Sequence, residues 1–295
     1  MQHSEFTLVA PDGASLAYRL WIPQAGAKAI VCLIHGLGEH TGRYAQVAAT
    51  LGNAGYALLG FDQRGHGKTP GTRGVTPSFD TLLGDVQRVV DAASERFSGK
   101  PCFLYGHSMG GAWVLNFAIR RRPTLAGVIA TSPLLRTAFK PPAMKLAAGK
   151  LLYRVAPNTA LPNGLNLAAI SRDPEVVAAY REDPLVHDKM SARLGLDLVT
   201  HGEWALAHAN DFPPLPLLLV HGTADQITSP QATREFASKV KGDCTLKLWP
   251  GCYHETHNEP EREAVLQFMC NWLDTQVEGQ RSGKQENAAT LSSAG

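Results

Sequence analysis

Residues 101–119 read PCFLYGHSMGGAWVLNFAI, an apolar run that leads into a glycine-flanked serine and continues as a helical pattern. Gly106-His107-Ser108-Met109-Gly110 fits G-x-S-x-G, in which a sharp turn joins a strand to a helix and exposes the serine hydroxyl. Glycines on both sides remove the Cβ atoms that would crowd such a turn. The segment therefore predicts a strand, a strained turn and a helix, with Ser108 as a candidate nucleophile. The alternative is a glycine-rich turn with an idle serine.

Short apolar runs and helical patterns alternate along most of the chain. Such runs, bounded by small or polar residues, are typical of strands buried on both faces of a parallel sheet. The runs cover 29–34, 56–61, 101–105, 125–131, 215–220 and 244–249, and the helical patterns cover 44–53, 78–97, 109–121, 231–240 and 260–277. This alternation predicts an α/β protein with a mostly parallel central sheet and helices on both faces. Ligands bind at the carboxyl ends of strands in such sheets, so a site is expected in the loops that follow the runs.

Three stretches depart from this alternation. Residues 133–214 separate two runs that should be neighbouring strands, and they contain several prolines and short helical patterns. We interpret them as a helical cap, or lid, inserted into a core made of residues 1–132 and 215–277. Residues 1–23 predict a β-hairpin around a Pro-Asp-Gly turn. Residues 278–295 are rich in Ser, Gly and Gln, which favours a disordered tail.

The first helix of the cap, at about 143–155, is amphipathic. One face carries Met144, Ala147, Ala148, Leu151, Leu152 and Val155, and Lys150 and Arg154 lie on the other. A lid helix of this kind is suited to transient contact with a membrane or micelle. Packing of the same face on the domain below is the alternative.

A serine hydroxyl becomes a strong nucleophile only when a base takes its proton. In folds of this type the triad runs in the order serine, acid, histidine. His254 lies in the loop after the last apolar run, and we predict it as the base, with His257 as the nearest rival. Asp225 follows the preceding run, where a carboxylate would orient the imidazole and stabilise the imidazolium. An ordinary loop aspartate is the alternative for Asp225.

An oxyanion that forms during attack on a carbonyl needs two fixed N–H donors. We predict the backbone amide of Met109, just after the serine, and the backbone amide of Leu37, in the loop His35-Gly36-Leu37-Gly38. The loop 62–67, Asp-Gln-Arg-Gly-His-Gly, lacks the Gly-Lys-Ser/Thr ending of a phosphate-binding loop. We expect it to be structural, with an ion pair between Asp62 and Arg64.

Composition excludes several classes of protein. The 295 residues are 44% hydrophobic, enough for a full core, and the formal net charge of +2 gives no general attraction to nucleic acid. Five cysteines at irregular spacing predict neither a disulfide framework nor a zinc site, and no metal constellation stands out. With no secretion signal or apolar span in the sequence, a cytoplasmic protein is expected.

Several motifs together resemble a known family. They are HGLGEHTGRY (35–44), FDQRGHGKTPGTRG (61–74), GHSMGG (106–111), SRDPEVVAAYREDPLVH (171–187), HGTADQITSP (221–230) and GCYHETHNEPEREAVLQFMCNWL (251–273). The chain, from about Phe6 to Leu273, is similar to monoacylglycerol lipases and bacterial lysophospholipase-like hydrolases of the α/β-hydrolase fold.

The resemblance implies hydrolysis of a single-chain acyl ester such as monoacylglycerol, without a cofactor, through an acyl-enzyme. It places the triad on Ser108, Asp225 and His254 and the oxyanion amides on Leu37 and Met109. It also places polar contacts to the glycerol end of the substrate on Arg43, His107 and Tyr180.

Other activities stay open on the same scaffold, because fold does not fix function. A general carboxylesterase or a lysophospholipase is the nearest alternative, followed by a thioesterase, an amidase or a perhydrolase. A non-catalytic binding protein with this fold is a further class. Such proteins usually lack a triad residue, whereas this sequence keeps candidates for all three.

Overall fold

The computed structural model of the chain describes residues 1–139 and 143–293. Its centre is an eight-stranded sheet in the order β1-β2-β4-β3-β5-β6-β9-β10. The strands of this sheet are β1 Gln2–Val9, β2 Ser15–Ile22, β3 Ala29–Ile34, β4 Tyr56–Phe61, β5 Cys102–His107, β6 Gly127–Thr131, β9 Leu217–Gly222 and β10 Cys244–Trp249. The pairs from β4 to β10 are parallel, and the N-terminal hairpin β1–β2 adds the antiparallel edge.

Helices cover both faces of the sheet. They are α1 Ala45–Asn53, α2 Phe79–Arg96, α3 Met109–Arg121, α4 Ala143–Val155, α5 Pro174–Glu182, α6 Ala192–Ala207, α7 Pro230–Lys239 and α8 Arg262–Ser293. Short 3-10 helices lie at Thr41–Tyr44, Leu167–Ala169, Ala209–Asp211 and Thr256–Asn258. Helices α1 and α8 share one hydrophobic core with the sheet, and α2, α3 and α7 share the other.

The sequence of α2 shows why a helix forms on that face. Leu82, Val86, Val89 and Ala93 recur every three or four residues and are all buried. Ser78 caps the helix, because its hydroxyl accepts the amide of Thr81 at 3.2 Å. Burial of each Val or Leu side chain contributes about 1.5–3 kcal/mol, so the apolar stripe fixes the helix against the sheet.

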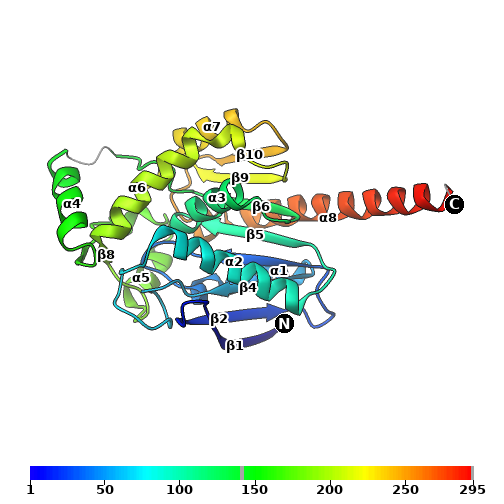
Figure 1. Cartoon of the computed structure of the whole chain (residues 1–295), viewed down its shortest axis with the longest axis horizontal. Helices are drawn as coiled ribbons and strands as arrows, with labels where there is room; N and C mark the ends of the chain where they lie inside the picture. The colour runs from blue at the N-terminus through cyan, green and yellow to red at the C-terminus, as the bar shows by residue number, and fades with distance from the viewer. Residues whose placement is uncertain (140–142, 294–295) are drawn as a thin grey trace.

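The cap is inserted between β6 and β9, which nevertheless pair in parallel as neighbours. It contains α4, α5, α6 and a two-stranded ribbon of β7 Ala160–Pro162 and β8 Lys189–Ser191. Figure 1 shows these elements gathered at one end of the molecule. The predicted fold, a mostly parallel sheet with helices on both faces and an inserted helical cap, is confirmed.

The C-terminal helix α8 extends beyond the core. It continues to Ser293 and projects beyond the domain on the side opposite α4 (Figure 1), into the segment 278–295 whose composition favours a disordered tail. Residues 278–295 have few apolar side chains to bury, but they include many helix-forming residues and no proline. The helix is already nucleated in the core, so it can propagate outward at little free-energy cost.

The loop after β4 also differs in its ion pairs, and the expected pair between Asp62 and Arg64 is wrong. Arg64 instead donates to both carboxylate oxygens of Asp85, at 2.7 and 2.8 Å, and to Asp12. Asp62 accepts the amide and the hydroxyl of Thr41 at 2.9 and 2.5 Å. Asp62 therefore bonds the 3-10 helix at Thr41–Tyr44, whereas Arg64 bonds α2 and the turn of the N-terminal hairpin. Among the described helices, none is both long and apolar enough to cross a membrane.

Candidate active site

Ser108 lies in a strained turn between β5 and α3. Its φ of 53° and ψ of −114° belong to a backbone region that residues other than glycine rarely adopt. Neighbouring backbone packs so closely that a Cβ on Gly106 would lie 2.3 Å from the carbonyl oxygen of Gly110. A Cβ on Gly110 would lie 2.0 Å from the carbonyl oxygen of Ile34. The G-x-S-x-G spacing therefore allows a turn that holds Ser108 at the end of its strand.

The structure brings Ser108, His254 and Asp225 together from three loops. Ser108 Oγ lies 2.9 Å from Nε2 of His254, and Nδ1 of His254 lies 2.8 Å from Oδ2 of Asp225. An ionised carboxylate can only accept, so Nδ1 carries the proton and Nε2 is left to accept from the serine hydroxyl. This row of hydrogen bonds could pass a proton from the serine to the histidine.

Asp225 is fixed by a dense set of donors. Its Oδ1 accepts the backbone amides of Ile227 and Thr228 at 2.7 and 3.0 Å. Its Oδ2 accepts from the hydroxyl of Thr228 at 2.8 Å and from His221 at 3.0 Å. Burial alone would raise the pKa of Asp225, but the charge of His254 and these hydrogen bonds hold that pKa well below its usual range. Asp225 is therefore ionised at neutral pH.

The pKa of His254 is set by its burial and by the charge of Asp225. The side chain is buried, and burial alone would lower its pKa. The charge of Asp225 and the hydrogen bond between them outweigh burial, so the pKa of His254 is raised above its ordinary value. An imidazole with a raised pKa is a stronger base once it has lost its proton.

The rival histidine, His257, contacts neither Ser108 nor Asp225 among the hydrogen bonds of the described residues. Its ring stacks on Tyr44 at 5.1 Å, and burial lowers its pKa to about 4. His107 lies between the two histidines, with its ring centroid 4.8 Å from each. The geometry favours His254 as the base.

The loop after β3 faces the start of α3. The amide of Gly36 donates to Oε1 of Glu39 at 2.6 Å, and this bond closes the turn that contains Leu37. Gly38 has a φ of +78°, and a Cβ there would lie 2.5 Å from the carbonyl oxygen of His187 in the cap. Met109 is the first residue of α3, where backbone amides are left without intrahelical partners. Both predicted oxyanion donors thus lie in segments with fixed backbone.

Arg43 lies in a buried ion-pair cluster beside this loop. Its guanidinium donates to both oxygens of Glu255 at 2.8 and 2.7 Å and to Glu39 at 2.7 Å. It also lies over the ring of Tyr180 from α5, 4.5 Å from the centroid. Burial lowers the pKa of Arg43, but the two carboxylates outweigh it and raise that pKa, so the charge is permanent.

Sequence reasoning missed Glu39 and Glu255. Both are almost completely buried, and both pair with Arg43. Their positions in the sequence could have indicated a role in the site, because Glu39 follows the predicted oxyanion loop and Glu255 follows His254 directly. Buried carboxylates need a cationic partner, and spacing alone does not show which arginine supplies it.

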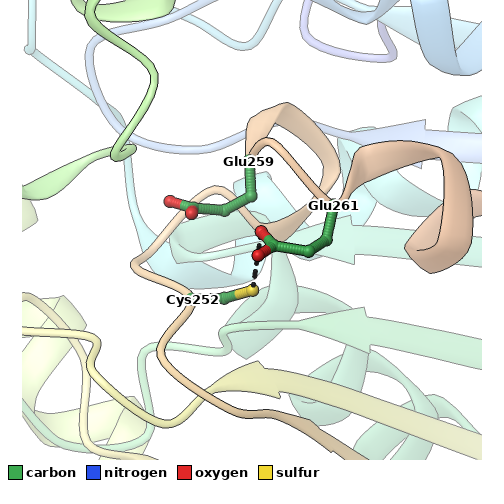
Figure 2. A group of neighbouring side chains, drawn as sticks. All are labelled: Cys252, Glu259 and Glu261. Atoms are coloured by element: carbon green, nitrogen blue, oxygen red, sulfur yellow. Dashed lines mark hydrogen bonds between the residues drawn. The ribbon is translucent and has the colours of Figure 1, made fainter.

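One group of side chains has the composition of a metal site. Cys252, Glu259 and Glu261 place one potential ligand atom each within 4.8 Å of one another (Figure 2). Arg172, from the cap, already donates to both carboxylates and lies 3.6 Å from the thiol sulfur. The positive charge that balances this group is therefore an arginine side chain.

Comparisons with known proteins identify relatives of this chain. The family described as "Serine aminopeptidase, S33" matches residues 25–261. An uncharacterized abhydrolase domain-containing protein of Dictyostelium discoideum is 37% identical over 96% of this chain, which spans only 30% of that longer protein. The monoacylglycerol lipase of Mycolicibacterium smegmatis is 34% identical over 92% of this chain and 96% of its own length. The crystal structure of the Paleococcus ferrophilus monoacylglycerol lipase matches with a TM-score of 0.80 and 38% identity, covering 88% of this chain and 99% of that one.

Proposed function

This chain belongs to the Serine aminopeptidase, S33 family, and from that premise we propose that it is a serine hydrolase that cleaves monoacylglycerol to a fatty acid and glycerol. The family description does not fix the substrate, because one fold can serve both amide and ester bonds. The observation that carries the proposal is the row of hydrogen bonds from Ser108 through His254 to Asp225. Similarity to monoacylglycerol lipases over most of both chains supports a single-chain lipid ester as the substrate.

In the proposed reaction, Ser108 Oγ attacks the ester carbonyl carbon while Nε2 of His254 takes the hydroxyl proton. Asp225 holds the imidazole and stabilises the imidazolium that forms. The amides of Leu37 and Met109 donate to the oxyanion of the tetrahedral intermediate. The intermediate collapses as the bond between the acyl carbon and the glycerol oxygen breaks, and His254 returns its proton to that oxygen.

The second half of the reaction uses the same groups. A water molecule attacks the acyl-enzyme carbonyl carbon and loses a proton to His254. Collapse of this intermediate breaks the bond to Ser108 Oγ, which takes the proton back from His254. The fatty acid leaves, and the enzyme returns to its starting state without a cofactor.

The alcohol end of the substrate is proposed to meet the cluster around Arg43. Carboxylate oxygens of Glu39 and Glu255 accept hydrogen bonds from hydroxyl groups, and Tyr180 offers a phenol hydroxyl near Gly38. We propose His107 as a further contact to the glycerol end, since its Nδ1 bonds Thr131 at 3.0 Å and its ring lies 4.8 Å from that of His254.

We also propose that the cap makes transient contact with a membrane or micelle through α4. Met144, Leu151 and Val155 lie along one side of this helix, with 84%, 63% and 71% of their surface exposed. Exposed apolar side chains of this size on one helix face are suited to insertion among lipid chains. Such contact would bring the enzyme to a substrate that partitions into lipid.

We propose the cytoplasm as the working compartment. All five cysteines are free thiols, and Cys32 and Cys102 share a thiol–thiol hydrogen bond of 3.7 Å rather than a disulfide. Thiols so close together persist most readily in a reducing compartment.

A substrate panel tests the proposed function. We would measure kcat/KM of the purified protein on monoacylglycerols of short to long chain, p-nitrophenyl esters and lysophosphatidylcholine. The proposal expects the highest value on a monoacylglycerol. Hydrolysis confined to short activated esters would contradict the lipid substrate and leave a carboxylesterase. A preference for lysophosphatidylcholine would instead assign a lysophospholipase.

A further inference from the structure

A short cap segment just before α5 runs along the loop that carries His254. The carbonyl of Ile170 accepts the amide of Glu255, the residue after His254, at 2.8 Å. The hydroxyl of Ser171 donates to the carbonyl of Asn258 at 2.9 Å. Backbone groups of the His254 loop are therefore bonded directly to the cap.

Glu259 connects this loop to the cap through its side chain. It is fully buried, and its Oε1 accepts two backbone amides, those of Arg172 at 2.9 Å and Tyr253 at 3.2 Å. Its Oε2 accepts from Nε of Arg172 at 2.5 Å. One carboxylate thus bonds a cap arginine and the residue that immediately precedes His254.

Figure 2 shows contacts between the two ends of the same loop. Cys252 comes from the turn after β10, and Glu259 and Glu261 come from the turn that leads into α8. The thiol of Cys252 donates to Glu261 at 3.6 Å, and the Arg172 guanidinium bonds both glutamates. Without Arg172, the fully buried carboxylate of Glu259 would lose its cation, and the loop would have to move to hydrate it.

We propose that Arg172 and Glu259 are positioning residues that hold His254 within reach of Ser108, so that the cap helps to set the rate of proton transfer. This inference rests on the proposed function of Ser108 and His254. Neither residue contacts the reacting atoms, and both act through the loop. A displacement of about 1 Å in a catalytic group can lower the rate about 100-fold, so a small shift of this loop is sufficient.

The pKa of His254 depends on the charged and titratable groups around it, so the pH profile of kcat/KM changes when His254 moves relative to them. They come from the loops after β3, β9 and β10 and from the end of β5, and comprise Asp225, Glu255, Glu39, His107 and His257. Asp225 is the only hydrogen-bonding carboxylate of His254 among the described residues, so its contribution to the basicity of His254 falls fastest when the loop moves. Looser pairing moves the acidic limb of kcat/KM to lower pH.

The test compares Arg172→Ala, Arg172→Lys and Glu259→Gln with wild type. Arg136→Ala is the matched control, because Arg136 also pairs with two glutamates, Glu203 and Glu235, but on an exposed surface. We expect Arg172→Ala to lower kcat about 10- to 100-fold with KM within about two-fold. The acidic limb should move to lower pH, and added guanidinium chloride at millimolar concentration should restore part of kcat. Arg172→Lys should be intermediate, and Arg136→Ala should match wild type.

A second readout keeps the test independent of the substrate. The rate at which a fluorophosphonate labels Ser108 depends on His254, and it is measured per folded molecule after near-ultraviolet circular dichroism. We expect this rate to fall with kcat in Arg172→Ala and Glu259→Gln. An unchanged rate and an unchanged pH profile in folded variants would overturn the positioning role. If wild type is labelled but cleaves no monoacylglycerol, the proposed substrate fails while the labelling rates still decide this inference.

Discussion

Ser108 stands in a backbone conformation that the rest of the structure has to impose. A φ of 53° at a residue with a side chain is unfavourable by about 1–3 kcal/mol, and it persists only where surrounding contacts over-determine it. Here the contacts are the close approaches at Gly106 and Gly110. This strained conformation places the Ser108 hydroxyl at the carboxyl end of β5, next to the imidazole of His254.

The first prediction concerns the nucleophile. Ser108→Ala should fold like wild type, because alanine meets the same strain, and kcat should fall about 1000-fold or more. The measurement is steady-state hydrolysis of the best monoacylglycerol, with circular dichroism as the control for folding. Near-full activity in the variant would assign the chemistry to another residue.

The second prediction is a pH profile. His254 acts as a base only when neutral, so kcat/KM should rise with pH through the pKa of His254, which the charge of Asp225 raises. Asp225→Asn removes that charge, so the midpoint should move to lower pH and kcat should fall about 1000- to 10000-fold. The check is the profile of both proteins on one soluble ester. If the acidic limb of kcat/KM has the same midpoint in Asp225→Asn as in wild type, Asp225 does not raise the pKa of His254.

Individual site residues differ in how far the sequence could identify them. Ser108, Asp225 and His254 each follow an apolar run, so strand order predicts that they converge. The roles of Glu39 and Glu255 depend on which arginine lies between them in space. The pair of Arg43 with Glu39 is local, four residues apart, but the pair of Arg43 with Glu255 joins positions 212 residues apart, and no periodicity along the chain encodes it.

At the scale of elements, α4 tests the proposed membrane contact. Leu151→Glu places a charge among the exposed apolar side chains of this helix, so binding to phospholipid vesicles should fall several-fold. Hydrolysis of a short soluble ester should stay within about two-fold of wild type. Val199→Glu, on a less exposed apolar position of α6, is the matched control. Equal vesicle binding by wild type and Leu151→Glu would contradict a role for this face.

Helix α6 holds a buried acid whose protonation should affect stability. Asp197 is 8% exposed, and burial raises its pKa to about 6, above the value of about 4 in an unfolded chain. Between these values the unfolded state ionises first, so this group removes stability as pH rises through the window. Asp197→Asn should therefore stabilise the protein by about 1–2 kcal/mol at pH 7.5 and by little at pH 4. Thermal unfolding at both pH values measures this, and a variant that gains no stability at pH 7.5 would contradict it.

Across the whole molecule, the strands of the parallel sheet were the most predictable elements. Buried strands need continuous apolar runs, and the predicted bounds of β3, β4 and β10 match the structure. The ribbon of β7 and β8 was missed, since three-residue strands at a partly exposed surface carry no such pattern. For the extension of α8, composition reports how much surface a segment can bury, not whether a helix that starts in the core continues beyond it.

Chemical modification of Ser108, with hydrolysis followed in the same sample, tests whether this serine is the nucleophile. The protein is titrated with a fluorophosphonate, intact mass gives the number of groups attached, and peptide mapping locates them. We expect one group per chain, on Ser108, and monoacylglycerol hydrolysis that falls in proportion to labelling. Hydrolysis that continues when Ser108 is fully modified would contradict the role of Ser108 as the nucleophile.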